Sequence, residues 1–307
     1  MDKKTENFLG IDVGGTHVKI GLVDTKGQIL QFAKEITASL RENPLGFNLA
    51  FVEVVGKYLA KFPEVQHVGI GLPGLVSKDR TTTLEIPAIS ELNGFDLKSA
   101  LLEKYPNTIF HLENDASAAA VGELHFGTGQ TSQDYLFITL GTGIGSALIL
   151  DGEVFKGVRG NAMEMGHMLS RGNSRLEPLI GRNGILKIAA RMMDTFPEEV
   201  GQLAGQELGM HVLVGAASAG NSIALKTFAE VGEILGEAIV STVRILDVNE
   251  IYFGGGISAA LPYIMPSLDK TVHQYLSPYY LSDIKMQRAT LENDAGTLGA
   301  AALCFMD

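Results

Sequence analysis

Two stretches of the chain share one order of apolar and polar positions: an apolar run, a turn rich in glycine, a second apolar run and a closing aspartate. They read FLGIDVGGTHVKIGLVD and YLFITLGTGIGSALILD. When Gly14 is aligned with Gly141, Asp24 falls on Asp151, so the pattern recurs about half a chain apart. Short apolar runs bounded by turn residues predict strands. Each stretch therefore predicts a β-hairpin with its glycines at the bend, and the repeat predicts a duplicated chain.

Strands and helices alternate along the rest of the chain. An apolar run ending in Pro-Gly comes first, followed by a strand that passes directly into an alanine-rich helix. The segment from about 160 to 215 is expected to be mostly helical, and a long amphipathic helix then leads into a strand that ends in glycines. Alternation of this kind predicts an α/β fold. The segments are HVGIGLPGLV, NTIFHLENDASAAAVGELHFG, NSIALKTFAEVGEILGEAIVSTVRILD, EIYFGGG, IKMQRATL and AGTLGAAALCFM.

The chain is long enough for two hydrophobic cores. It has 307 residues and is 46% hydrophobic, whereas a single core stops growing at roughly 250 to 300 residues. We place an N-terminal lobe at 1–118 and a C-terminal lobe with a helical middle segment at 119–307. The final helix is a candidate to pack back on the first lobe.

Composition narrows the partners and the compartment. The net charge of −11 argues against nucleic acid as the main partner. No apolar run approaches the roughly 18 residues of a membrane span, and the opening MDKKTENFLG lacks the apolar centre of a signal peptide. Cys304 is the one cysteine, which excludes an internal disulfide and a cysteine cluster for metal. We expect a cytoplasmic protein with neither a membrane nor a nucleic-acid partner.

The two glycine turns are also candidate phosphate sites. Successive backbone N–H groups in such turns form anion-binding nests without any helix. Two ordinary hairpins with glycine for turn geometry remain the structural alternative. The occurrence of both in one chain favours a split phosphate site.

Seven segments, in order, are similar to the ROK family of repressors, open reading frames and sugar kinases: LGIDVGGTHVKIGLVD, GIGLPG, ENDASAAAVGE, TLGTGIGSALILDG, EMGHM, IYFGGGIS and AGTLGAAA. The resemblance covers nearly the whole chain. It implies the two-lobed, actin-like ATPase fold shared by sugar kinases and heat-shock ATPases, with duplicated βββαβα lobes. A sugar and ATP would occupy the cleft, and a homodimer is the common assembly.

Asp115 is the candidate general base. Phosphoryl transfer to a sugar hydroxyl requires a group beside that hydroxyl to take its proton. Asp115 stands where a strand ends and a helix begins, so a plain helix N-cap is its structural alternative. The resemblance implies that the Asn114–Asp115 pair holds the sugar and that Asp115 deprotonates its hydroxyl.

The resemblance also implies the other sugar ligands. Glu164 and His167 lie three residues apart in NAMEMGHM, and carboxylate and imidazole groups suit a polyol. A surface glutamate and a satisfied histidine are the alternative for this pair. Glu177 matches the family's glutamate that closes the sugar pocket, and Gly74 of GIGLPG completes the implied site.

For the nucleotide, the resemblance implies that Asp12 acts on Mg²⁺ directly or through water. The three glycines of YFGGGI would let a purine or ribose lie on backbone, although a tight strand-to-helix turn explains them equally. His17 occupies a place where the family often has lysine, and Lys19 is a possible substitute. The implied nucleotide residues are Asp12, Gly14, Gly15, Thr16, Thr142, Gly143, Gly254, Gly255 and Gly256.

One segment departs from the family pattern. Most members carry a CxCGxxGCxE zinc hairpin between the sugar-binding histidine and glutamate, whereas here the interval is HMLSRGNSRLE, without cysteine. A tetrahedral Cys/His site cannot form from it. We expect no zinc, and the sequence leaves open what orients His167.

These features predict an ATP- and Mg²⁺-dependent hexose kinase, with glucose and its 6-hydroxyl as first choice. The alternatives are an N-acetylglucosamine or N-acetylmannosamine kinase, a polyphosphate-dependent glucokinase and a non-catalytic sugar sensor. The family's repressors carry a winged helix before the first glycine hairpin, but here the hairpin strand starts at Phe8. We therefore expect no DNA-binding domain.

Overall fold

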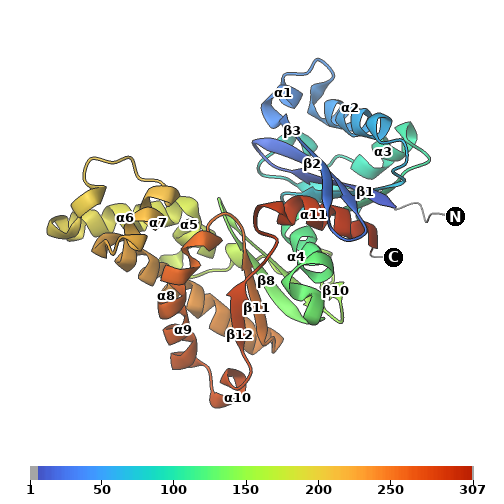
Figure 1. The fold of residues 1–307 in the computed structure, drawn as a ribbon. Helices are drawn as coiled ribbons and strands as arrows, with labels where there is room; N and C mark the ends of the chain where they lie inside the picture. The colour runs from blue at the N-terminus through green and yellow to red at the C-terminus, as the bar shows by residue number, and fades with distance from the viewer. Residues whose placement is uncertain (1–5, 306–307) are drawn as a thin grey trace. The chain divides into compact units, whose positions relative to one another are not determined.

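The computed structural model describes residues 6–305 and divides into two compact units. Unit 1 comprises the chain up to Asp134, Ala147–Met163 and the residues from Thr290 on, and unit 2 comprises Tyr135–Ser146 and Glu164–Ala289 (Figure 1). These units are defined by compactness, whereas the predicted lobes 1–118 and 119–307 are defined by duplication of the chain. The predicted lobe boundary at 118/119 therefore stays a prediction.

Unit 1 is built on a five-stranded sheet in the order β3-β2-β1-β4-β7. The first three strands are antiparallel, and β1, β4 and β7 run parallel. The strands are β1 Asn7–Val13, β2 His17–Asp24, β3 Ile29–Ile36, β4 His67–Leu72 and β7 Ile109–Asn114, and a small β5 Leu75–Val76/β6 Thr83–Glu85 ladder stands apart. The helices are α1 Thr37–Arg41, α2 Gly46–Lys61, α3 Leu97–Lys104, α4 Asp115–Phe126 and α11 Ala295–Ala302.

The alternation of β1 separates two layers. Leu9, Ile11 and Val13 are buried in one core with side chains of α2 and α3. The even-numbered side of the same strand faces α11, because successive strand residues point to opposite faces. There Phe8 joins a second cluster with Leu298 of that helix.

A row of glycines crosses three neighbouring strands beneath α11. Gly10 is paired with Gly21 on β2 and with Gly69 on β4. A Cβ on Gly10 would lie 2.2 Å from the Thr297 carbonyl oxygen, and one on Gly69 would lie 1.7 Å from that of Ala300. The helix can therefore rest on the sheet backbone only because these positions lack side chains. Figure 1 shows α11 beside β1 and α4, which come much earlier in the chain.

The second large sheet repeats the strand order of the first. Its order is β10-β9-β8-β11-β12, with β8, β11 and β12 parallel and β9 and β10 antiparallel. In each half the third, second, first, fourth and fifth strands lie side by side, which confirms the predicted duplication and the α/β class. The strands are β8 Tyr135–Leu140, β9 Ile144–Leu150, β10 Glu153–Val154, β11 Glu250–Gly254 and β12 Lys285–Arg288.

The helices of unit 2 pack around α8 Ser222–Leu246, which contacts α6 and α9. Asn221 begins it by accepting a hydrogen bond from the Ala224 N–H, and Asp247 ends it in the left-handed conformation with φ 55°. The others are α5 Leu176–Ile180, α6 Arg182–Thr195, α7 Met210–Ser218, α9 Leu261–Tyr275 and α10 Pro278–Leu281. No described helix alone is long and apolar enough to cross a membrane, although α7 and α8 together, bent by 110°, have the required length and composition.

The prediction of a mostly helical segment from 160 to 215 is wrong in its first part. Residues 156–175 form turns and single 3₁₀ turns, and the α-helices begin at Leu176. Gly157, Gly160 and Gly172 all have positive φ angles, between 62° and 93°, which end helical runs.

Candidate active site

Asn114, the last residue of β7, caps α4. Its side-chain oxygen accepts hydrogen bonds from the backbone N–H groups of Ala116 at 2.9 Å and Ser117 at 3.1 Å. The N-cap of α4 is therefore Asn114 and not Asp115, for which capping was the structural alternative. Asp115 is the first helical residue, and its Oδ1 lies 2.8 Å from the Ala116 nitrogen.

The Asn114 amide also reaches the predicted sugar loop. Its Nδ2 donates to the carbonyl oxygen of Gly74 at 3.1 Å. Gly74 has φ 125°, and a Cβ there would lie 2.2 Å from the Glu85 carbonyl oxygen, so only glycine fits. Three of the predicted sugar residues of unit 1, Gly74, Asn114 and Asp115, are thus gathered at one corner.

Asp12 lies on β1, which β4 separates from β7, and pairs with Lys19 across the hairpin. The Lys19 Nζ is 2.9 Å from Asp12 Oδ2, and the two residues are cross-strand partners. A Cβ on Gly296 would lie 2.4 Å from the same oxygen, so the carboxylate also touches the start of α11. His17 is exposed on the same hairpin. The lysine that accompanies this aspartate is therefore Lys19.

The glycine turn of unit 1 is braced from α1. Thr37 is fully buried, donates from its hydroxyl to the Gly14 carbonyl oxygen at 2.7 Å and from its N–H to the Thr16 carbonyl oxygen at 3.1 Å. Gly15 and Thr16 remain exposed at the tip. The bend is rigid on its inner side and open on its outer side, as a phosphate nest requires.

In unit 2 the equivalent turn is held by Glu177. Its Oε2 accepts a hydrogen bond from the Ile144 N–H at 2.9 Å, and a Cβ on Gly143 would lie 2.1 Å from the same atom. The Arg182 N–H donates to the Gly141 carbonyl oxygen at 3.1 Å. The structure therefore brings a predicted sugar residue, Glu177, against the predicted phosphate turn at Thr142 and Gly143.

Glu164 and His167 lie in the same electrostatic neighbourhood. The His167 Nδ1 is 3.8 Å from Glu164 Oε2. Partial burial, with a further contribution from the Glu177 charge, raises the pKa of Glu164, and His167 acts against that rise. The backbone between them is fixed, since the Met165 N–H donates to the Ser146 hydroxyl at 3.2 Å. The three predicted sugar residues of unit 2 thus influence one another.

The three glycines after β11 serve different purposes. A Cβ on Gly254 would lie 2.7 Å from the Phe137 ring, and Gly255 has φ 83° with the Leu140 carbonyl oxygen 2.4 Å from a Cβ. Gly256 alone has nothing within 4 Å of the Cβ position. Packing and turn geometry explain the first two, and Gly256 is the one that leaves room for a ligand.

The segment that replaces the zinc hairpin is a small hairpin of its own, Met168–Leu176. The Ser170 N–H donates to the Ser174 carbonyl oxygen at 2.7 Å, and the Leu176 N–H donates to that of Met168 at 2.9 Å. Arg171 anchors it to α8, with Nε 2.9 Å from Glu237 Oε2 and Nη2 bound to the other carboxylate oxygen. Among residues 6–305 no group of three or more His, Cys, Asp or Glu side chains is placed to hold a metal.

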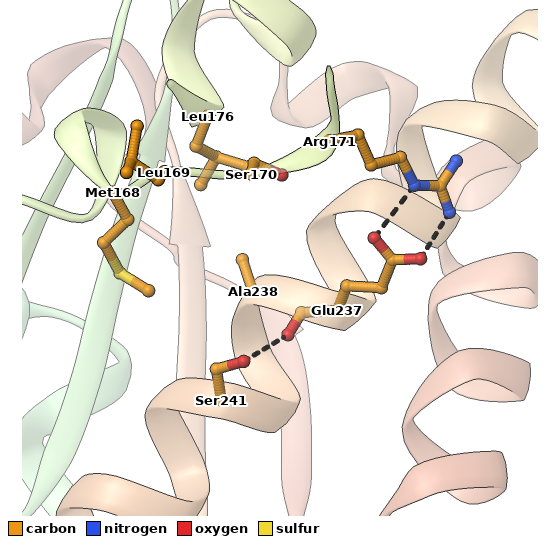
Figure 2. A pocket seen from close by; sticks show the side chains of 8 residues that line it. All are labelled: Met168, Leu169, Ser170, Arg171, Leu176, Glu237, Ala238 and Ser241. Atoms are coloured by element: carbon orange, nitrogen blue, oxygen red, sulfur yellow. Dashed lines mark hydrogen bonds and ion pairs between the residues drawn. The ribbon is translucent and has the colours of Figure 1, made fainter. Parts of the chain in front are cut away.

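A cavity of about 210 Å³ lies between this hairpin and α8 (Figure 2). Arg171 and Glu237 bind each other at its edge, and the Ser241 hydroxyl donates to the Glu237 carbonyl oxygen. Arg171, Glu237 and Ser241 are therefore engaged with one another. It is lined by Met168, Leu169, Ser170, Arg171, Leu176, Glu237, Ala238 and Ser241.

The sequence did not single out the ion pair beside the Asn114 corner. Glu113, the residue before Asn114, is almost fully buried and pairs with Arg80 at 2.9 Å. The only sequence signal was a charged residue inside an apolar strand, which calls for a partner that sequence cannot name.

Comparison with known proteins gives concordant matches. The model of the ROK family matches residues 8–306. A glucokinase of Halalkalibacterium halodurans is 28% identical over 96% of this chain and 94% of its own. The structure of a proposed sugar kinase from Cytophaga hutchinsonii is 39% identical, with TM-score 0.93, over 98% of this chain and 100% of that one. A ROK family glucokinase from Streptomyces griseus in complex with glucose and AMPPNP is 28% identical, with TM-score 0.79, over 98% and 100%.

Proposed function

Because this chain belongs to the ROK family and is a sugar kinase with the actin-like ATPase fold, we propose that it transfers the γ-phosphoryl group of ATP to the 6-hydroxyl of glucose. The Streptomyces griseus relative, which binds glucose and AMPPNP, supports both the sugar and the nucleotide. The observation that carries the proposal is the corner at which Asn114 caps α4 and holds Gly74, so that Asp115 heads the helix without serving as its cap.

In the proposed reaction the sugar hydroxyl oxygen forms a bond to the γ-phosphorus, and the bond from that phosphorus to the bridging oxygen of ATP breaks. Asp115 accepts the hydroxyl proton as the new bond forms. Asn114, Glu164, His167 and Glu177 orient the sugar through its other hydroxyls, since amide, carboxylate and imidazole groups can each donate or accept there.

Mg²⁺ fits the residues of the β1–β2 hairpin. Mg²⁺ is usually held in proteins by one or two carboxylates, several waters and the substrate phosphates. Asp12 supplies a largely covered carboxylate beside the glycine turn, with 17% of its side chain exposed. When bound, the metal supplies positive charge to the phosphate oxygens. The exposed turn at Gly15 and Thr16, the turn at Thr142 and Gly143, and the open Gly256 would contact the nucleotide.

The homodimer, the cytoplasmic location and the dependence on Mg²⁺ are further parts of this proposal. The homodimer and the dependence on Mg²⁺ rest on the family resemblance, and the cytoplasmic location rests on the composition of the chain. The deciding experiment is a coupled assay of turnover with glucose, mannose, N-acetylglucosamine and N-acetylmannosamine, each with ATP or polyphosphate as donor. Phosphorus NMR of the product identifies the phosphorylated hydroxyl.

We expect the highest kcat/KM for glucose with ATP and a 6-phosphate product. A clear preference for an N-acetylhexosamine or for polyphosphate would replace the substrate or the donor but keep the reaction class. Binding of a sugar without turnover from any donor would leave a non-catalytic sensor and overturn the proposal.

A further inference from the structure

The guanidinium group of Arg80 is largely buried, and each of its three nitrogens contacts an acceptor oxygen. Nε donates to Oε2 of Glu113 at 2.9 Å, and Nη2 forms an ion pair with Oε1 of the same carboxylate at 2.9 Å. Nη2 also donates to the Gly160 carbonyl oxygen at 2.8 Å, and Nη1 donates to those of Ser77 at 3.0 Å and Val76 at 3.4 Å. Only 11% of the side chain is exposed. Four hydrogen bonds and the ion pair fix the plane of the fork as well as its position.

The backbone of Arg80 is held in a conformation that residues with a side chain rarely adopt. Its φ is 57°, in the left-handed region. Such a conformation persists only where the surroundings over-determine it. Here the Arg80 N–H donates to the Ser77 carbonyl oxygen at 2.8 Å, and the Ser77 hydroxyl accepts from the N–H groups of Thr81 and Thr82. These hydrogen bonds hold the turn in the conformation in which the Arg80 guanidinium contacts Glu113.

Glu113 connects the Arg80 turn to the predicted sugar residues Asn114 and Asp115. Its Oε1 accepts a hydrogen bond from the Asn114 N–H at 2.9 Å, and 4% of its side chain is exposed. Lys156 is the other cation close to this carboxylate, with Nζ 3.7 Å from Oε2 and 43% of its side chain exposed. The fork of Arg80 thus fixes a carboxylate that in turn fixes the peptide leading into Asn114 and Asp115.

We propose that Arg80 is a positioning residue for phosphoryl transfer, which acts through Glu113 to set where the Asp115 carboxylate meets the acceptor hydroxyl. This inference rests on the proposed function. A buried ion pair is weak as a source of stability, because the cost of desolvating both charges offsets their attraction. The bidentate fork does supply fixed geometry, and a general base needs fixed geometry more than any other group at the site.

The test compares Arg80→Lys and Glu113→Gln with the wild type and with Arg191→Lys. Lysine keeps the charge of Arg80 but loses the planar fork. Glutamine keeps an oxygen for the Asn114 N–H but loses the negative charge. Arg191 is the matched control, since it pairs with Glu230 on the exposed surface of unit 2. For each protein kcat, KM for glucose, KM for ATP and the melting temperature are measured, with kinetics well below melting.

We expect Arg80→Lys to lower kcat about 10- to 100-fold, because small displacements of a reacting group have effects of this size. KM for glucose should stay within about threefold, since most predicted sugar ligands are untouched and positioning of the base matters only in the transition state. Glu113→Gln should follow the same pattern, and Arg191→Lys should match the wild type.

Absence of hexose turnover in the wild type would overturn the proposed function before this question arises. With an active wild type, a kcat of Arg80→Lys equal to that of the control would overturn the inference, even if the melting temperature fell. A raised KM at unchanged kcat would also overturn it, because Arg80 would then support binding. If Arg80→Lys does not fold, Glu113→Gln decides by the same criteria.

Discussion

Two adjacent side chains divide two tasks at the start of α4. Asn114 accepts from the N–H groups of Ala116 and Ser117, and Asp115, one residue further on, shares the Ala116 donor while Asn114 caps the helix. An aspartate that also capped the helix could not be replaced without loss of stability. Because the cap is Asn114, chemistry and stability can be separated by mutation.

Asp115→Asn should lower kcat by about 10²- to 10⁴-fold, the usual contribution of a general base. The fold should be retained, since the capping bonds of Asn114 remain. Asn114→Ala is the informative partner, because it should cost about 0.5 to 2 kcal/mol of stability by removing the cap. Steady-state kinetics and urea denaturation of both variants check this, and near-normal turnover of Asp115→Asn would contradict the assignment.

Glu164 should make sugar affinity depend on pH. Its pKa lies above the ordinary 4.5, chiefly through partial burial, so the folded protein keeps this proton to a higher pH than the unfolded chain does. The folded state binds more protons just above pH 4.5, so this group's contribution to stability decreases as pH rises through that window. Sugar binding, in contrast, needs the ionised carboxylate, so the affinity for sugar should increase as pH rises through the same window.

The glucose Kd should therefore increase as the pH is lowered from 7 towards 4.5, with a midpoint above 4.5. Glu164→Gln should bind more weakly at pH 7 and lose this step, whereas the surface variant Glu230→Gln should keep it. Isothermal titration across the range measures all three. An unchanged step in Glu164→Gln would show that another group is responsible for the titration.

For single residues, the family motifs in the sequence predicted which residues belong to the site. The sequence did not predict contacts between residues that are distant in the chain. Lys19 was a candidate because it lies two residues after His17, at whose position the family often has lysine. Arg80 was not, because it lies 33 positions before Glu113 and the intervening segment carries no pattern that predicts their meeting. Pairing between separate loops is decided by tertiary packing.

At the scale of elements, the approach of α11 to the sheet depends on missing side chains. Gly10→Ala would place a methyl group 2.2 Å from the Thr297 carbonyl oxygen, so the helix would have to move. We expect a loss of about 1 to 3 kcal/mol, typical of overpacking. Gly215→Ala is the control, since this exposed position within α7 has open space around its Cβ and should gain about 0.5 to 1 kcal/mol from the higher helix propensity. Equal effects in urea denaturation would contradict the packing argument.

The Met168–Leu176 hairpin should make the protein independent of zinc. Its backbone bonds and the Arg171–Glu237 pair order the residues on either side of it, which metal ligation does in most of the family. EDTA should stop catalysis by removing Mg²⁺, and Mg²⁺ alone should restore it. Elemental analysis should find no stoichiometric zinc. Activity that returned only with zinc would mean that His167 recruits a metal through ligands we have not identified.

Regular elements followed from the sequence better than irregular ones. Both glycine hairpins and α8 were predicted, because strand alternation and helical periodicity are local properties. Residues 156–175 were not, since their shape is set by contacts such as the Asn161 amide, which pairs with both the N–H and the carbonyl of Val76. Local propensity does not encode such contacts.

At the scale of the whole molecule, the chain closes unit 1 with its last helix. Phe8 and Val23 from the first strands share a cluster with Leu298, Ala301 and Cys304. Removal of the residues from Ala295 on should therefore expose β1, β2 and β4 and accelerate their amide hydrogen exchange, while α8 and α9 of unit 2 keep their protection. Mass spectrometry of the exchanged peptides measures both. Uniform acceleration throughout, or none in unit 1, would contradict this role of α11.

The late position of α11 also bears on how the protein is made. A chain leaves the ribosome from its N-terminus at about 5 to 20 residues per second, so the strands of unit 1 emerge on the order of ten seconds before the helix that covers them. All of unit 2 is synthesised in that interval. The nascent chain must meanwhile carry an uncovered apolar face around Phe8 and the glycine row. We expect that face to be the part of the newborn protein that chaperones bind, and its release to follow the synthesis of α11.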